Sequence, residues 1–171
     1  MSEALDVAVL MGSDSDWPYV EGGVAKLKGF GLSFDVRVIS AHRTPERLVR
    51  YIGEAEQRGC QVFIAAAGWS AALAGIVAAH TLVPVIGVPI PNSPLNGLDA
   101  ILSTVQMPGG VPVATMSLGK AGASNAAIFA AKIIGLSRPE LRARVEQSQL
   151  DMRAKVMAKD EALQVKVGEL S

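Results

Sequence analysis

The sequence predicts an α/β protein in which helices cover both faces of a parallel β-sheet. Three observations lead to this prediction: five short apolar runs occur along the chain, helix-like segments separate them, and four of the five runs are apolar almost throughout. Strands of this kind are typical of parallel sheets that are buried on both faces. The 171 residues suffice for one domain with a substantial core.

The five apolar runs are the expected strands, and the segments between them are the expected helices. Strands are expected at residues 7–11, 34–39, 62–66, 85–88 and 113–116, and helices at residues 17–28, 45–58, 70–80, 97–105 and 123–134. Pro45 suits the first position of a helix behind Thr44 as its cap, and Gly135 suits a helix end. This order predicts a flavodoxin-like three-layer α/β/α sandwich that binds ligands at the carboxyl ends of its strands.

Residues 138–171 are expected to form a C-terminal helical extension, separate from a catalytic domain of residues 1–137. The extension holds thirteen of the thirty-two charged residues of the chain. Within it, a partial helical stripe is formed by Leu141, Val145, Gln149 and Met152. The pattern alone fits either a solvated helix or an arm that reaches onto a neighbouring subunit.

Composition argues against several classes of protein. Sixteen basic residues balance sixteen acidic ones, so no global charge indicates binding to nucleic acid or to a membrane surface. The single cysteine, Cys60, excludes an intrachain disulfide and agrees with a reducing compartment. The first residues show no basic segment followed by an apolar one, so we expect a cytoplasmic protein.

The middle of the chain is almost uncharged, which predicts an oligomer. Between Gly59 and Gly119 the only charged residue is Asp99, and residues 62–90 carry no charge. That length raises the possibility of a membrane span, but Pro84 and Pro89 interrupt it. We therefore expect a buried strand, a helix and a second buried strand, with the apolar helix packed against another subunit.

The turn after the first expected strand combines Gly12 with Ser13, Asp14, Ser15 and Asp16. Backbone N–H groups and hydroxyls at a helix N-terminus suit a phosphate. The carboxylates suit ribose hydroxyls or cap the helix. The turn matches neither a dinucleotide-binding G-x-G-x-x-G sequence nor a Walker A sequence. This argues against a dinucleotide and against ATP as the ligand.

The turn after the second expected strand, residues 40–45, places His42 beside Arg43. An imidazole exchanges protons near neutral pH, and a guanidinium forks onto a phosphate or carboxylate. The chain has two histidines, and the other, His80, ends an alanine-rich helix where its ring can satisfy backbone carbonyls. His42 is therefore the preferred acid/base candidate.

The remaining turns give weaker signals. Small residues around Gly68 and Ser70 permit close approach of a ligand or of a subunit. The polar, proline-rich turn of residues 89–97 is suited to close over a site, and Lys120 between two glycines suits an anion. No spacing of metal ligands occurs, so we expect no metal, and Cys60 is a poor candidate for a nucleophile.

Five ordered motifs give the chain a specific resemblance to a known family. They cover residues 11–16, 40–45, 82–89, 106–108 and 119–123. With these the chain resembles the PurE family of N5-carboxyaminoimidazole ribonucleotide mutases of purine biosynthesis, over residues 7–134. The resemblance implies a flavodoxin-like fold, an octamer of identical subunits, a ribonucleotide substrate and no metal, biotin or ATP. It also favours the arm-like role of the tail.

The resemblance also implies roles for single residues. Ser13 and Asp16 match positions that hold the ribose phosphate part of the nucleotide, Arg43 matches the residue that grips the phosphate, and His42 matches the general acid/base. In the family mechanism a carboxylate leaves nitrogen as carbon dioxide and is added to C4, while His42 shuttles the proton that C4 gives up. The remaining residues that we expect to bind substrate are Ser40, Gly68, Ser70 and Lys120.

One segment departs from the mutase pattern and keeps an alternative open. The pattern has a histidine where this chain has Ala72. Ser70 and Ala72 resemble the related class that carboxylates aminoimidazole ribonucleotide directly with carbon dioxide, whereas Arg43 and residues 119–123 resemble the mutase. We favour the mutase over the direct carboxylase. The missing imidazole also keeps open a non-catalytic nucleotide-binding oligomer.

Overall fold

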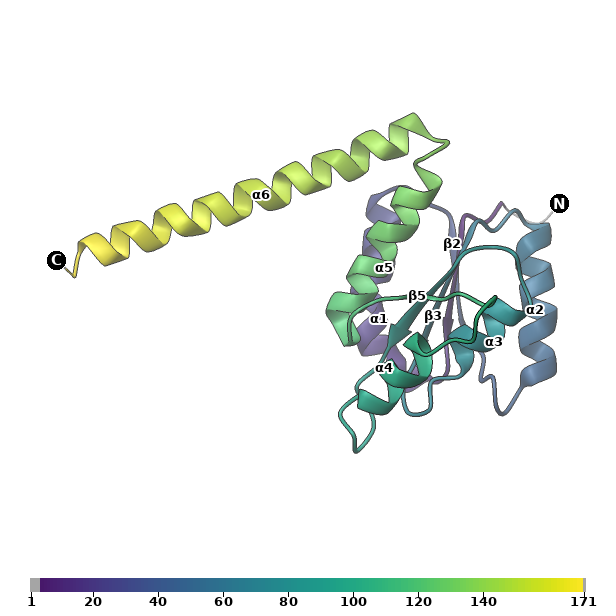
Figure 1. Cartoon of the computed structure of the whole chain (residues 1–171). Coiled ribbons are helices and arrows are strands. Elements are labelled where there is room, and N and C mark those ends of the chain that lie inside the picture. The colour runs from purple at the N-terminus through teal and green to yellow at the C-terminus, as the bar shows by residue number, and fades with distance from the viewer. Residues whose placement is uncertain (1–3, 171) are drawn as a thin grey trace.

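The computed structural model describes residues 4–170 and contains one five-stranded parallel sheet (Figure 1). The strands are β1 (Val7–Met11), β2 (Phe34–Val38), β3 (Val62–Ala67), β4 (Val85–Pro89) and β5 (Ala114–Thr115). Their order in the sheet is β2-β1-β3-β4-β5, with every neighbouring pair parallel. This order confirms the predicted flavodoxin-like topology, although β5 is shorter than expected.

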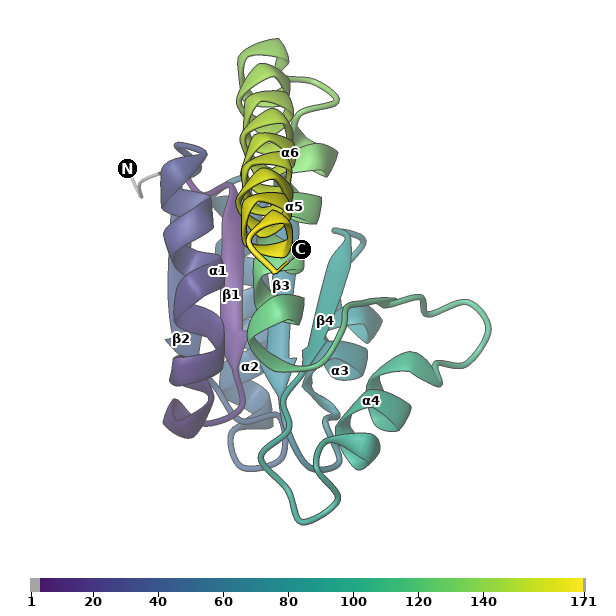
Figure 2. The ribbon, with the colours of Figure 1, turned by 90° about the vertical axis from the view of Figure 1, so that its left-hand side faces the viewer.

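Helices cover both faces of the sheet, as predicted (Figure 2). The helices α1 (Trp17–Gly29) and α5 (Gly119–Ile134) pack together on one face, whereas α2 (Pro45–Gln57), α3 (Leu73–Ala79) and α4 (Leu98–Val105) lie on the other. The central strand β1 shows the physical reason. Val7, Val9 and Met11 point into the first core, and the alternating Ala8 and Leu10 point into the second.

Two helices begin three or four residues away from their predicted starts. The helix expected from Ser70 begins at Leu73, because residues 68–72 form a loop in which Trp69 takes a left-handed backbone conformation, with φ of 54°. Ser70 is therefore not the cap of this helix. The helix expected from Ala123 already begins at Gly119, so Lys120 lies in its first turn.

The other predicted boundaries hold more closely. Pro45 begins α2, and α5 ends before Gly135. Thr44 precedes α2 but makes no side-chain cap, because its hydroxyl donates instead to the backbone carbonyl of Ser40, at 2.9 Å. This hydrogen bond joins the two ends of the turn formed by residues 40–44.

The helical extension is α6 (Pro139–Gly168), which projects away from the sheet (Figure 1). Leu141 and Val145 in its first turns join the core, and Arg144 donates to the carbonyl of Phe30 at 2.7 Å. From Leu150 onward the helix is exposed. Within residues 4–170 no helix is both long enough and apolar enough to cross a membrane.

Candidate active site

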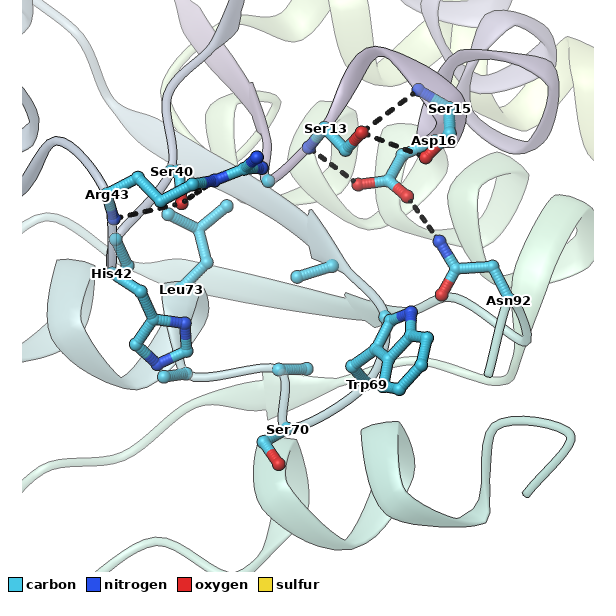
Figure 3. Close-up of a pocket in the computed structure, with 16 residues that line it drawn as sticks. Ser13, Ser15, Asp16, Ser40, His42, Arg43, Trp69, Ser70, Leu73 and Asn92 are labelled. Atoms are coloured by element: carbon cyan, nitrogen blue, oxygen red, sulfur yellow. Dashed lines mark hydrogen bonds between the residues drawn. The ribbon is translucent and has the colours of Figure 1, made fainter. Parts of the chain in front are cut away.

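A cavity of about 460 Å³ opens at the carboxyl ends of β1, β2 and β3, the sheet edge at which we expected a ligand (Figure 3). Turns after these three strands and one residue after β4 line it. The polar and aromatic residues around it are Ser13, Ser15, Asp16, Ser40, His42, Arg43, Trp69, Ser70 and Asn92. The fold therefore brings together seven of the eight residues predicted for the site.

The first turn is held by its own hydrogen bonds. Ser13 is the N-cap of the short 3₁₀ helix η1 (Asp14–Asp16), and its backbone N–H donates to Asp16 Oδ2 at 3.1 Å. The hydroxyl of Ser13 accepts from the N–H of Ser15 at 3.3 Å. These residues therefore cap a helix and line the cavity at the same time.

Asp16 is only 1% exposed although it lines the cavity. Asn92 Nδ2 donates to Asp16 Oδ1 at 2.8 Å, and the N–H of Ser13 serves the other oxygen. Burial raises the pKa of the Asp16 carboxyl above its usual value, although both of these donors favour the ionised form. The carboxylate thus has a fixed orientation toward the cavity.

Asn92 was not among the predicted site residues. Its Oδ1 atom is buried and, within residues 4–170, has no hydrogen-bond partner. This oxygen lies against Gly68, where a Cβ atom would overlap it. Gly68 therefore leaves room for Asn92, which in turn holds Asp16. The sequence did indicate that the turn of residues 89–97 is suited to close over a site, but nothing in it distinguished Asn92 from its neighbours.

The second turn presents Arg43 and His42. The backbone N–H and the Nε–H of Arg43 both donate to Ser40 Oγ, at 3.2 and 3.3 Å. The guanidinium extends toward Ser13, and its two terminal nitrogens have no partner within residues 4–170 (Figure 3). Ser40 therefore orients Arg43 and leaves its fork available for an anion. His42 is exposed on the cavity wall.

The loop after β3 supplies the opposite wall. Trp69 and Ser70 are exposed at the cavity, and Ala72 lines it without a polar group. Figure 3 shows the Trp69 indole and the His42 imidazole on opposite sides of the cavity. Trp69 was also not predicted as a site residue.

Three other candidates lie outside the cavity. Lys120 is exposed in the first turn of α5 and does not line it. His80 lies at the end of α3, where Nδ1 is 2.8 Å from the carbonyl oxygen of Ile76. Cys60 is buried, and burial raises the pKa of its thiol to about 11, which argues against a nucleophilic role. Among residues 4–170 no three His, Cys, Asp or Glu side chains cluster as metal ligands.

Known proteins resemble this chain over most of its length. The chain is 53% identical over 152 residues to the N5-carboxyaminoimidazole ribonucleotide mutase of Saccharolobus solfataricus, a match that covers 89% of this chain and 95% of that protein. It is 51% identical over 165 residues to the enzyme of the same name from Mycobacterium tuberculosis, covering 96% and 94% of the two chains.

Solved structures agree with the sequence relatives. The fold matches Treponema denticola PurE with a TM-score of 0.82 at 33% identity, covering 92% of this chain and 97% of that chain. A variant of Treponema denticola PurE2 matches with a TM-score of 0.85 at 32% identity, covering 95% and 99%. Residues 6–155 also match the family described as AIR carboxylase. The parallel sheet, the cavity at its edge and these relatives together show that the chain belongs to the AIR carboxylase family.

Proposed function

We propose that this protein is an N5-carboxyaminoimidazole ribonucleotide mutase, which converts its substrate to 4-carboxy-5-aminoimidazole ribonucleotide. The observation that carries the proposal is the placement of His42 and Arg43 in one turn across a single cavity from Ser13 and Asp16. An acid/base group thus lies beside an anion grip and opposite a buried carboxylate. The mutase name of relatives at 51–53% identity supports this reading.

The proposed binding mode follows from the polar groups. The free fork of Arg43 and the hydroxyl of Ser13 suit the phosphate, since both face one part of the cavity. The fixed carboxylate of Asp16 suits the ribose hydroxyls. Ser40 acts through Arg43, and Gly68 through Asn92. Ser70 remains a proposed contact to the heterocycle, whereas Lys120 is left out because it does not line the cavity.

The proposed chemistry needs one proton-exchanging group. The bond between N5 and the carboxyl carbon breaks, carbon dioxide leaves, and the electron pair on N5 takes up a proton. C4 then attacks the carbon dioxide, and C4 loses its proton as the new C–C bond forms. One proton is taken up and one is released, so His42 is sufficient if it gives the first and accepts the second. Small residues such as Ala71 and Ala72 leave space for the carbon dioxide.

The direct carboxylase remains the second candidate because Ala72 stands where the mutase pattern has histidine. An isotope experiment distinguishes the mutase from the direct carboxylase. The substrate carries ¹³C in its N5-carboxylate, and the solution contains an excess of unlabelled bicarbonate. A mutase transfers the label to the carboxyl group on C4 of the product. Unlabelled product, formed equally fast from aminoimidazole ribonucleotide and bicarbonate, would overturn the proposal. Binding of nucleotide without turnover of either substrate would indicate the non-catalytic oligomer.

We also propose that the protein is a homo-oligomer, with the octamer implied by the family resemblance as the expected size. Helix α4 exposes three large apolar side chains, Leu98, Leu102 and Val105, at a spacing of four and three residues. This spacing places them on one side of the helix. A continuous exposed apolar stripe of this kind is typical of a surface that a second subunit covers.

The extension α6 is proposed to pack on a neighbouring subunit. Leu141 and Val145 are buried by the core of their own chain, and Met152, Val156 and Leu163 continue the same stripe at spacings of seven, four and seven residues. These spacings keep all five residues on one helix face. The stripe is therefore covered at its start and exposed beyond, which supports an arm rather than a solvated helix.

A further inference from the structure

Trp69 holds a backbone conformation that its side chain disfavours. Its φ of 54° lies in the left-handed region, in which the Cβ atom of a bulky residue is crowded and a glycine is not. Its indole is 60% exposed, so burial in the core of this chain does not compensate for the strain. Strained residues persist where the surrounding structure or a function requires them. The exposure of Trp69 makes a role toward a ligand the stronger explanation.

The cavity supplies what the indole would need. Its polar anchors, including Ser13, Asp16 and Arg43, come from the turns after β1 and β2, whereas the side formed by residues 67–73 is mostly small and apolar. Among the described residues that line the cavity, Trp69 carries the only large flat apolar surface. Figure 3 places this surface across the cavity from His42.

We propose that the indole of Trp69 stacks on the aminoimidazole ring of the bound nucleotide and holds C4 toward His42. This inference rests on the proposed function, because it takes the heterocycle from that substrate. A flat heterocycle gains affinity by stacking on an indole without needing a matched hydrogen-bond pattern. With the phosphate held by Arg43, stacking on Trp69 fixes the other end of the nucleotide.

Intrinsic fluorescence tests the contact directly. The chain has two tryptophans, and Trp17 is not among the residues that line the cavity, so Trp17→Phe leaves Trp69 as the only indole. Aminoimidazole ribonucleotide, added without bicarbonate so that no carboxylation occurs, is expected to quench this emission. Ribose 5-phosphate, which lacks the ring, is expected to bind more weakly and to leave the emission unchanged. The Trp69→Phe variant, which retains Trp17, is the control and should show no quenching.

A second measurement separates stacking from a structural role. Trp69→Gly relieves the strained backbone, so its melting temperature is expected to rise by about 2–4 °C. Its affinity for aminoimidazole ribonucleotide is expected to fall about tenfold or more, while its affinity for ribose 5-phosphate stays the same. Trp69→Phe keeps a flat ring and should fall between the wild type and the glycine variant in affinity.

The outcomes that overturn the inference differ from those that overturn the proposed function. Wild-type protein that does not bind aminoimidazole ribonucleotide at all would reject the function. Binding that leaves the Trp69 emission unchanged would reject the stacking alone. A Trp69→Gly variant that loses affinity equally for both ligands, or that has a lower oligomer mass, would assign Trp69 to the framework or to a subunit interface instead.

Discussion

Asn92 Nδ2 donates a hydrogen bond of 2.8 Å to Asp16 Oδ1, although the two residues are 76 positions apart in the chain. This bond joins the turn after β4 to the turn after β1, directly at the cavity. It supplies one of the donors that favour the ionised form of this buried carboxyl, whose pKa is raised by burial. The orientation and charge of Asp16 therefore depend on a residue from a distant turn.

Replacing Asn92 with alanine should weaken nucleotide binding without removing any proposed direct contact. The loss of a hydrogen bond to a charged group costs about 1.5–3 kcal/mol of folding free energy. Affinity is expected to fall because the Asp16 carboxylate loses the donor that holds its orientation. The pKa of Asp16 should rise further, because a donor to its ionised form is lost. When the solution is acidified, the affinity of the variant for nucleotide should begin to fall at a higher pH than the affinity of the wild type. Calorimetry at several pH values measures both. Asn125→Ala, on the exposed side of α5, is the control. Identical pH profiles would contradict this coupling.

The contact between Gly68 and Asn92 predicts a non-additive pair of substitutions. A Cβ atom at position 68 would overlap Asn92 Oδ1, so Gly68→Ala should reduce both stability and affinity, with about 1–3 kcal/mol of lost folding free energy. In the Asn92→Ala background the overlapping atom is gone, and the same change should be at least about 1 kcal/mol less damaging. Denaturant unfolding of the four proteins measures this difference.

Gly53→Ala is the matched control for this cycle. Gly53 lies inside α2 with nothing near its missing Cβ, so alanine should stabilise the protein there. Additive effects of Gly68→Ala and Asn92→Ala would show that the two positions do not interact.

His42 and Arg43 should give opposite kinetic signatures although they are adjacent. His42→Asn removes the proposed proton exchange and should lower kcat by about 10²–10⁴-fold, with nucleotide binding largely preserved. Arg43→Ala removes a phosphate grip that acts equally on ground state and transition state, so KM should rise more than kcat falls. His80→Asn is the control for the loss of an imidazole, because His80 lies outside the cavity. A His42→Asn variant of normal kcat would assign proton transfer elsewhere.

The sequence was most informative where a feature repeats along the chain. Alternating apolar runs and helices predicted the strand order, and the order placed the turns that contain Asp16 and His42 at one edge. Trp69 and Asn92 were missed for a common physical reason. The left-handed backbone at Trp69 and the fit of Asn92 against Gly68 depend on packing between segments, which no local pattern reports. Lys120 was expected at the cavity because the predicted start of α5 was four residues too late.

The apolar stripe of α6 predicts which face of the extension binds a neighbouring subunit. Val156 lies on the stripe and Met157 does not, yet their exposures are nearly equal, at 63% and 64%. Val156→Glu should therefore lower the oligomer mass, or its stability on dilution, because it would bury a charge at the interface. Met157→Glu introduces the same charge one residue away and should leave the mass unchanged. Light scattering over a dilution series measures both. An equal effect of the two substitutions, or none, would contradict docking through this stripe.

The start of α6 is tied to the sheet by an ion pair that makes stability depend on pH. Asp6 accepts from Arg138 and, at 2.9 Å, from the backbone N–H of Ser33. Burial raises the pKa of Asp6, but these donors outweigh it and hold the pKa below its ordinary value of 3.8. An acid with a lowered pKa in the folded state stabilises the protein above the ordinary pKa, and this stabilisation is lost as the pH falls through the lowered value.

Asp6→Asn should thus unfold about 1–2 kcal/mol more easily than the wild type at pH 7, with the difference shrinking below about pH 4. Urea unfolding at several pH values, with the exposed Asp151→Asn as control, measures this difference. If the difference in unfolding free energy between the wild type and Asp6→Asn stays constant down to pH 3, the proposed ion pair is contradicted. The contribution of Asp6 would then not depend on its charge.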